Sequence, residues 1–286
     1  MQAKRVFSPK TSVLMVFSLA MLVTFAWPGL SGGIASADDD CNIWGCDDDC
    51  EFTTDFRLED CTFDNDDSKG ANPYFSLEPG YQLELEGEED GEEIRVWIYV
   101  TENKEKITVP GIGKVSTRVV EEWEWVDGLL VEVSRNFFAR CKQTNDIYYF
   151  GEDVDICEAG LEPDDGGFLC EGDEPDHEGA WQAGQNGAKA GLIMPGTFLL
   201  GSRYFQEIAW DDGAVDRGEN VEMGLTAPDP NGGPDFTGCV MVVDTNPADG
   251  ICKTKDGDVK IYCPGVGLVM DEELELVCYG DDCDED

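Results

Sequence analysis

Apolar and polar residues alternate with a period of two along the middle of the chain, which predicts β-strands. Residues 81–86 alternate in this way. In residues 93–101, aliphatic side chains occupy every second position, and Arg95, Trp97 and Tyr99 lie between them. A strand with this pattern places its aliphatic side chains on one face and its larger mixed side chains on the other.

Two longer β-rich runs, 115–126 and 129–140, are joined by the dipeptide Asp127-Gly128. Both residues tolerate a positive φ angle, which a two-residue hairpin turn requires. We therefore predict a β-hairpin here.

The remaining chain continues the β pattern, and helical periodicity is scarce beyond the first 30 residues. Further strands are expected at 147–150, 197–210, 215–225, 237–243, 259–262 and 268–277. The 33 glycines and 13 prolines supply turns. We predict an all-β fold, mainly antiparallel, with disulfide-stapled loops, one of which is a long acidic loop at 151–180.

The N-terminus has the pattern of a secretory signal peptide, residues 1–37. Lys4, Arg5 and Lys10 precede an apolar run, and Ala35-Ser36-Ala37 provides a small-x-small cleavage pattern. The alternative is a single membrane anchor, but the apolar run is short for a stable span. We expect export to a secreted or periplasmic location.

The chain is strongly acidic, with 62 Asp and Glu against 19 Lys and Arg, a formal net charge of −43. The leader holds three of the basic residues and no acidic ones, so the mature charge is 16 − 62 = −46. Nucleic acids and anionic lipid head groups would be repelled, whereas cations or an extracellular ligand are acceptable partners. An alternative reason for the charge is solubility alone.

All twelve cysteines lie beyond the leader, and an even number in an exported chain predicts disulfides. Cys157 and Cys170 bracket the acidic loop, and we predict that they pair. Metal-thiolate chemistry is the alternative. The spacing of Cys41, Cys46 and Cys50 lacks the paired C-x2-C pattern of zinc ribbons.

Composition divides the mature chain into three zones. Residues 38–71 are acidic and cysteine-rich, residues 72–277 form the expected β domain, and residues 278–286 form an acidic tail. The first zone has too few apolar residues to build its own core and needs crosslinks or docking.

The middle zone resembles a family of uncharacterised exported bacterial β proteins. The stretches that carry the resemblance are 72–75 with 78–80, 148–153, 180–184 with 187–189, 191–195 and 262–269. The resemblance implies an antiparallel β fold, with a half-open barrel as one form of it, and implies no activity. The added cysteines and the acidic N-terminal zone depart from the family.

Candidates for catalysis are weak. His177 is the only histidine, and no Gly-x-Ser-x-Gly motif accompanies it, so we interpret it as an exposed loop residue. Paired carboxylates could hydrolyse glycosides, but acidic residues are too abundant to single out a pair. Gly184, Gly187 and Gly191 around Lys189 lack a phosphate-loop signature and are interpreted as turn formers.

Trp123 and Trp125 share one strand face, with Glu122 and Glu124 on the other. Such a pair could stack on a sugar ring, or it could belong to the core or to cross-strand packing. We favour the core or cross-strand packing.

Calcium is the one cofactor the sequence raises. Asp244, Asn246 and Asp249 resemble the start of a calcium loop, and Asp64 and Asp66 have similar spacing. Neither matches an EF-hand, and the alternative is a solvated acidic turn. We expect no other cofactor.

These observations favour an exported acidic binding or structural domain without enzymatic activity and with an unidentified ligand. The alternative is a secreted polysaccharide hydrolase that uses carboxylates.

Overall fold

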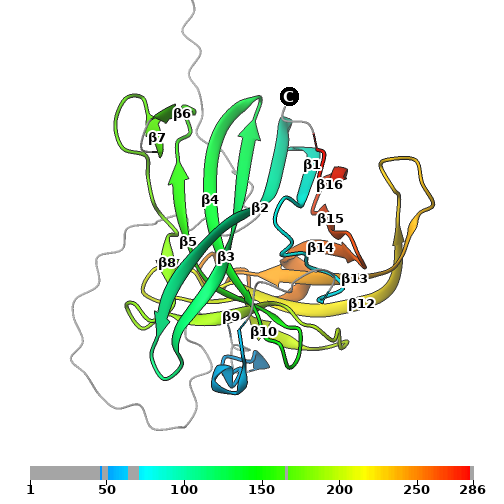
Figure 1. The fold of residues 1–286 in the computed structure, drawn as a ribbon. Helices are drawn as coiled ribbons and strands as arrows, with labels where there is room; N and C mark the ends of the chain where they lie inside the picture. Colours follow the sequence, from blue (N-terminus) through cyan, green and yellow to red (C-terminus); the bar gives the residue numbers. More distant parts are fainter. Residues whose placement is uncertain (1–45, 47–50, 64–70, 165–166, 284–286) are drawn as a thin grey trace, which may run out of the picture.

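The computed structural model describes Cys46 and residues 51–63, 71–164 and 167–283. Within these residues, the chain folds into one 14-stranded antiparallel sheet and a separate two-stranded hairpin, confirming the all-β prediction (Figure 1). The strands of the first half are β1 (Gln82–Glu89), β2 (Glu92–Val109), β3 (Gly113–Val126), β4 (Leu129–Arg140), β5 (Ile147–Ile156), β6 (Leu161–Asp164), β7 (Gly167–Cys170) and β8 (Trp181–Gln182). Those of the second half are β9 (Lys189–Met194), β10 (Arg203–Phe205), β11 (Glu207–Ile208), β12 (Arg217–Ala227), β13 (Phe236–Thr245), β14 (Asp258–Cys263), β15 (Gly267–Asp271) and β16 (Leu274–Gly280). Two 3-10 turns, η2 (Leu58–Asp60) and η3 (Thr254–Asp256), complete the described elements.

The sheet curls into a nearly closed barrel. Its strand order runs β10-β12-β13-β14-β15-β16-β1-β2-β3-β4-β5-β9-β11, so the strands at the two ends are β10 and β11. These two strands are separated along the chain by Gln206 alone. One short segment therefore pairs with both edges of the sheet, which leaves little edge unpaired.

The Asp127-Gly128 turn is confirmed, with φ angles of 49° and 80° at its two residues. Three other expectations were wrong. The strand expected at 197–210 is broken into β10 and β11, because the pairing partner changes at Gln206: β10 pairs with β12, and β11 pairs with β9. The strand expected at 268–277 is split by a turn at Glu272, whose φ angle is 52°. The loop expected at 151–180 holds the end of β5 and the hairpin β6–β7.

Residues 72–80, which we call the strap, precede β1. Leu77 in the strap is fully buried. The Gly265 amide donates to the Pro73 carbonyl at 2.7 Å, and the Gly80 amide donates to the Val100 carbonyl at 2.8 Å. The strap is therefore attached to the barrel at two places, the β14–β15 turn and β2.

Disulfides attach the peripheral segments to the barrel. The predicted Cys157–Cys170 bond is present and joins the chain before β6 to the end of β7. The other described bonds are Cys46–Cys252, Cys61–Cys141, Cys239–Cys263 and Cys278–Cys283. None of the ten cysteines in the described part of the chain is free. Cys41 and Cys50 lie outside the described residues. Five disulfides are typical of a protein that folds in an oxidising environment.

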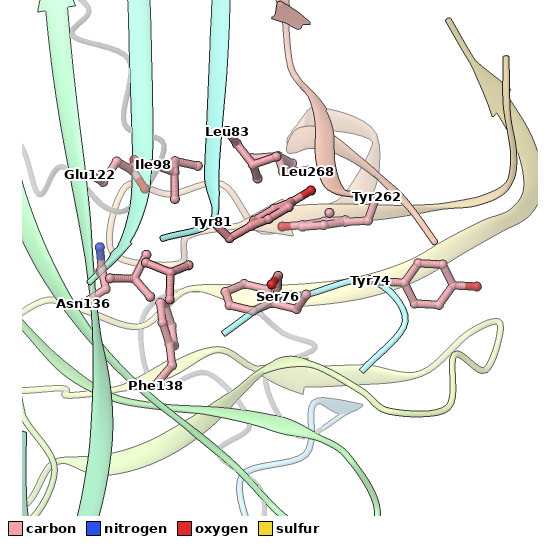
Figure 2. A pocket seen from close by; sticks show the side chains of 14 residues that line it. Tyr74, Ser76, Tyr81, Leu83, Ile98, Glu122, Asn136, Phe138, Tyr262 and Leu268 are labelled. Carbon is pink, nitrogen blue, oxygen red and sulfur yellow. The ribbon is translucent and has the colours of Figure 1, made fainter. Parts of the chain in front are cut away.

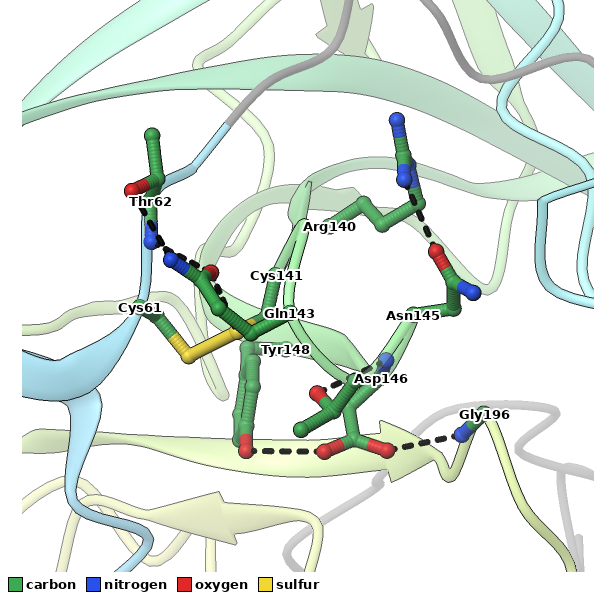
Figure 3. The surroundings of a disulfide bond; sticks show 10 residues. Cys61, Thr62, Arg140, Cys141, Gln143, Asn145, Asp146, Tyr148 and Gly196 are labelled. Atoms are coloured by element: carbon green, nitrogen blue, oxygen red, sulfur yellow. Dashed lines mark hydrogen bonds between the residues drawn. A yellow bond between two sulfur atoms is a disulfide. The ribbon is translucent and has the colours of Figure 1, made fainter.

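Figure 3 shows how the Cys61–Cys141 bond holds the N-terminal segment. Next to it, the Thr62 amide donates to Gln143 Oε1 at 2.9 Å, and Gln143 Nε2 donates back to Thr62 Oγ1 at 3.0 Å. This crosslink and these hydrogen bonds, together with the Cys46–Cys252 bond, dock the acidic N-terminal zone, as its low apolar content requires.

At the other end of the chain, β16 continues to Gly280, so the first residues of the expected acidic tail belong to the sheet. The expected leader, residues 1–37, lies outside the described residues. In the part of the chain that the structure describes, no helix has the length and apolar character needed to span a membrane.

Candidate ligand cavity and acidic barrel interior

The two faces of β3 have an unexpected orientation. Glu122 and Glu124 point into the barrel and are 7% and 3% exposed, whereas Trp123 and Trp125 lie on the outer face and are only partly buried. The strand register explains the choice: Val96 on β2 pairs with Glu124, so the face that holds the aliphatic residues of β2 also holds the glutamates of β3.

Three buried glutamates form a cluster across β3 and β4. Glu124 pairs directly with Glu132, and Glu122 is two residues from Glu124 on the same face. Burial raises the pKa of Glu132 to about 8. Burial also raises the pKa values of Glu122 and Glu124, and the neighbouring carboxyl groups raise them further. Glu132 is therefore largely a neutral acid at neutral pH, and burial disfavours the ionised forms of Glu122 and Glu124.

A second set of polar side chains lies on β5 and on the strands that follow it along the chain. The Tyr149 hydroxyl donates to Asn136 Oδ1 on β4, and Trp181 Nε1 donates to Glu207 Oε1 at 3.4 Å. Burial raises the pKa of Glu152 well above its usual range, and nearby Glu207 adds to the shift. Polar groups thus extend from β4 to the β11 end of the sheet through the interior.

A buried lysine balances part of the interior acid. Lys260 Nζ lies 3.3 Å from Asp244 Oδ2 and 3.6 Å from Asp271 Oδ2. Burial raises the pKa of Asp271 to about 7, and the Lys260 charge opposes that rise. Burial lowers the pKa of Lys260, but Asp271, Asp244 and other acidic neighbours together raise it by more, so the ammonium stays charged.

Between the strap and the barrel lies a cavity of about 40 Å³ (Figure 2). Most of its lining is aromatic or aliphatic, and its side chains include Tyr74, Phe75, Tyr81, Phe138, Tyr262 and Leu268. Ser76, Glu122 and Asn136 add polar groups, and Figure 2 shows Glu122 and Asn136 on the side formed by β3 and β4. Glu122 Oε2 accepts no hydrogen bond from any residue that the structure describes. A largely apolar cavity with a few convergent polar groups is the usual form of a small-molecule site.

Two of the predicted calcium ligands, Asp244 and Asn246, have partners within the protein. Asp244 points to Lys260 and also accepts from Gln206 Nε2 at 2.9 Å. Asn246 Oδ1 accepts from the Ala248 amide at 2.8 Å, and Asp249 is exposed. Asp64 and Asp66 lie outside the described residues. Within the described ranges, no three His, Cys, Asp or Glu side chains are arranged to hold a metal ion.

The outer tryptophans contact each other and their neighbours. Trp123 stacks on Trp125 with ring centroids 6.1 Å apart, and Phe168 of β7 meets Trp123 edge-on at 5.4 Å. Arg95 lies over the Trp125 ring at 4.8 Å. Because neighbouring side chains cover these ring faces, the geometry favours cross-strand packing over a sugar platform.

His177 and the glycine-rich segment fit their structural interpretations. The His177 side chain is 48% exposed, with Nδ1 2.6 Å from the Val154 carbonyl and 3.2 Å from Asp155. Contact with that carbonyl raises the pKa of His177. In the glycine-rich segment, the Gly184 amide donates to the Ala188 carbonyl at 2.8 Å, which makes a closed turn and not an open phosphate loop.

Sequence reasoning missed Glu122, Asn136 and the strap as parts of one site. The only signal was the position of Glu122 in register with the aliphatic face of β2, paired with Ile98. No protein-family model, curated protein or solved structure matches this chain.

Proposed function

We propose that this chain is an exported binding protein that holds a small molecule in the cavity between the strap and the barrel. The observation that carries the proposal is the lining of that cavity, in which aromatic rings surround Glu122 and Asn136. The disulfides and the leader-like N-terminus support export.

A polysaccharide hydrolase is less well supported. Glycoside hydrolases place two carboxyl groups on either side of the bond they cleave. Among the described residues that line the cavity, Glu122 carries the only carboxyl group. The neighbouring glutamates on the same face, Glu124 on β3 and Glu132 on β4, do not line the cavity. The site therefore offers one of the two groups that this reaction needs.

The test compares two substitutions at Ser76, which lines the cavity from the strap. Ser76→Leu adds bulk to the cavity, whereas Ser76→Ala removes the same hydroxyl, which accepts from the Glu78 amide at 3.3 Å, without filling it. Melting temperatures are measured with a panel of small neutral and charged compounds. We expect saturable stabilisation in wild type and Ser76→Ala that Ser76→Leu abolishes. Stabilisation that survives Ser76→Leu, or none in wild type with any compound, would contradict the proposal.

A further inference from the structure

We propose that the ligand of this cavity is a small organic ammonium ion, with Glu122 as its counter-charge. This inference rests on the proposed function and adds the chemical class of the ligand to it.

The first observation is the unpaired oxygen of Glu122. The residue is 7% exposed, it lines the cavity, and no described group donates to its Oε2. A buried carboxyl oxygen without a partner destabilises the fold, so the site favours a ligand that supplies a hydrogen-bond donor. A positively charged donor gains the most, because it favours the ionised form that burial disfavours at Glu122, and its hydrogen bond to the resulting carboxylate is charge-assisted.

Lys260 does not already fill this role. It lies near enough to Glu122 to lower the pKa of its carboxyl, but it does not line the cavity. Its ammonium is placed between Asp244 and Asp271, at 3.3 and 3.6 Å. Lys260 is therefore already held by two acidic partners of its own.

The second observation is the aromatic lining. Five rings border the cavity, those of Tyr74, Phe75, Tyr81, Phe138 and Tyr262. The faces of aromatic rings attract cations, and desolvated quaternary and tertiary ammonium groups are often held in this way. Burial raises the pKa values of Tyr81 and Tyr262, so their rings stay neutral phenols beside the bound charge.

The charge of the whole chain acts in the same direction. A formal charge of −43 gives the surface a negative potential, which raises the local concentration of cations and speeds their arrival. Anions of the same size would be excluded by the same field. Charge complementarity therefore holds at the scale of the molecule as well as at Glu122.

Cavity size limits the ligand. A single water needs roughly 10–15 Å³ by the same measure, so the 40 Å³ cavity holds the equivalent of about three waters. Methylammonium and trimethylammonium are within or near this size. Larger amines would require the strap to move.

The experiment titrates the mature chain with trimethylammonium chloride at constant ionic strength, using calorimetry and melting temperature. Isopropanol is the neutral probe, because it has the same branched shape and number of non-hydrogen atoms. Glu122→Gln removes the charge and keeps the shape. Glu124→Gln is the matched control, since Glu124 is equally buried on the same strand but does not line the cavity.

We expect saturable binding of trimethylammonium to wild type and Glu124→Gln, and at least tenfold weaker binding to Glu122→Gln and of isopropanol to wild type. Equal binding of isopropanol would overturn the ammonium assignment. If Ser76→Leu binds trimethylammonium as tightly as wild type does, the ammonium assignment is also overturned. If isopropanol binds as well as trimethylammonium and Ser76→Leu abolishes that binding, the cavity is still the binding site. The ammonium assignment then fails while the proposed function stands. If Glu122→Gln does not fold, magnetisation transfer from the trimethylammonium methyls to the Tyr81 and Phe138 rings decides the location in wild type, and its absence would overturn the inference.

Discussion

Glu124 and Glu132 stand directly opposite each other on β3 and β4, and both side chains are buried inside the barrel. Each carries a carboxyl oxygen that accepts no hydrogen bond from the described residues. Two such groups tolerate each other because burial favours the protonated form, which removes the repulsion between them. The interior of this acidic protein is therefore sensitive to pH.

We expect the free energy of unfolding to fall as the pH rises from about 4.5 through about 8. Glu132 has a folded pKa of about 8, above the value of 4.5 for a solvated glutamate, so the native state holds a proton that the unfolded state has released. The contribution of this proton to the free energy of unfolding is complete below pH 4.5 and is lost above pH 8. One such proton gives a slope of about 1.4 kcal/mol per pH unit.

Urea unfolding of wild type and Glu132→Gln between pH 5 and 8 measures this slope. Glu132→Gln should flatten it, while Glu105→Gln, at an exposed position, should leave it as in wild type. Parallel pH profiles in wild type and Glu132→Gln would show that Glu132 does not carry the effect.

The Cys157–Cys170 bond closes a loop that contains the β6–β7 hairpin. Replacing both cysteines with alanine should cost about 3 kcal/mol of stability by the chain-entropy model. The Cys278–Cys283 bond closes a shorter loop, and its double replacement should cost less, about 2 kcal/mol. Chemical denaturation compares the two variants, and a larger loss from the shorter loop would be contrary to expectation.

Trp123 packs against Phe168, Leu161 and Val133, where the β6–β7 hairpin meets the sheet. Trp123→Ala should therefore destabilise the protein by about 3 kcal/mol, at the low end for a tryptophan because the side chain is only partly buried. Leu199→Ala, at a position that is 61% exposed, should be nearly neutral. Calorimetric melts measure both. Unchanged stability of Trp123→Ala together with loss of sugar binding would restore the platform interpretation.

Gly184 and Gly187 have similar positive φ angles, 89° and 83°, but different surroundings. A Cβ at Gly184 would lie 2.5 Å from the Thr108 carbonyl oxygen, whereas a Cβ at Gly187 meets no atom within 4 Å. Gly187→Ala should cost only the left-handed strain, about 1 kcal/mol. Gly184→Ala should cost about 2 kcal/mol more, because backbone must move. Equal losses in thermal melts would mean that the close approach is relieved without cost.

Sodium chloride should raise the melting temperature, since salt screens repulsion within a chain of formal charge −43. Calcium that replaces sodium at constant ionic strength should not raise the melting temperature further by binding to Asp244, because Asp244 is already paired with Lys260. A melt series on wild type and Asp249→Asn checks both statements. A calcium effect lost in Asp249→Asn would establish the loop as a calcium site.

The sequence by itself determined the local structure where periodicity and turn chemistry agree. The hairpin at Asp127-Gly128 and the alternating face of 93–101 follow from preferences that act over a few residues. The Cys157–Cys170 bond could be predicted because the two cysteines bracket one loop. In each case the interacting residues are close along the chain.

Tertiary structure alone decided which face of each strand became the interior. Alternation shows that Glu122 and Trp123 point in opposite directions, but it does not say which direction is inward. Hydrophobicity favours burying the tryptophan, and the barrel buries the glutamate, because Ile98 and Val96 of β2 pair with Glu122 and Glu124. The cavity joins the strap to β1, β2, β3, β4, β14 and β15, so its lining comes from residues up to about 190 positions apart. Contacts at such separations leave no local pattern, since they form only when the sheet closes on itself.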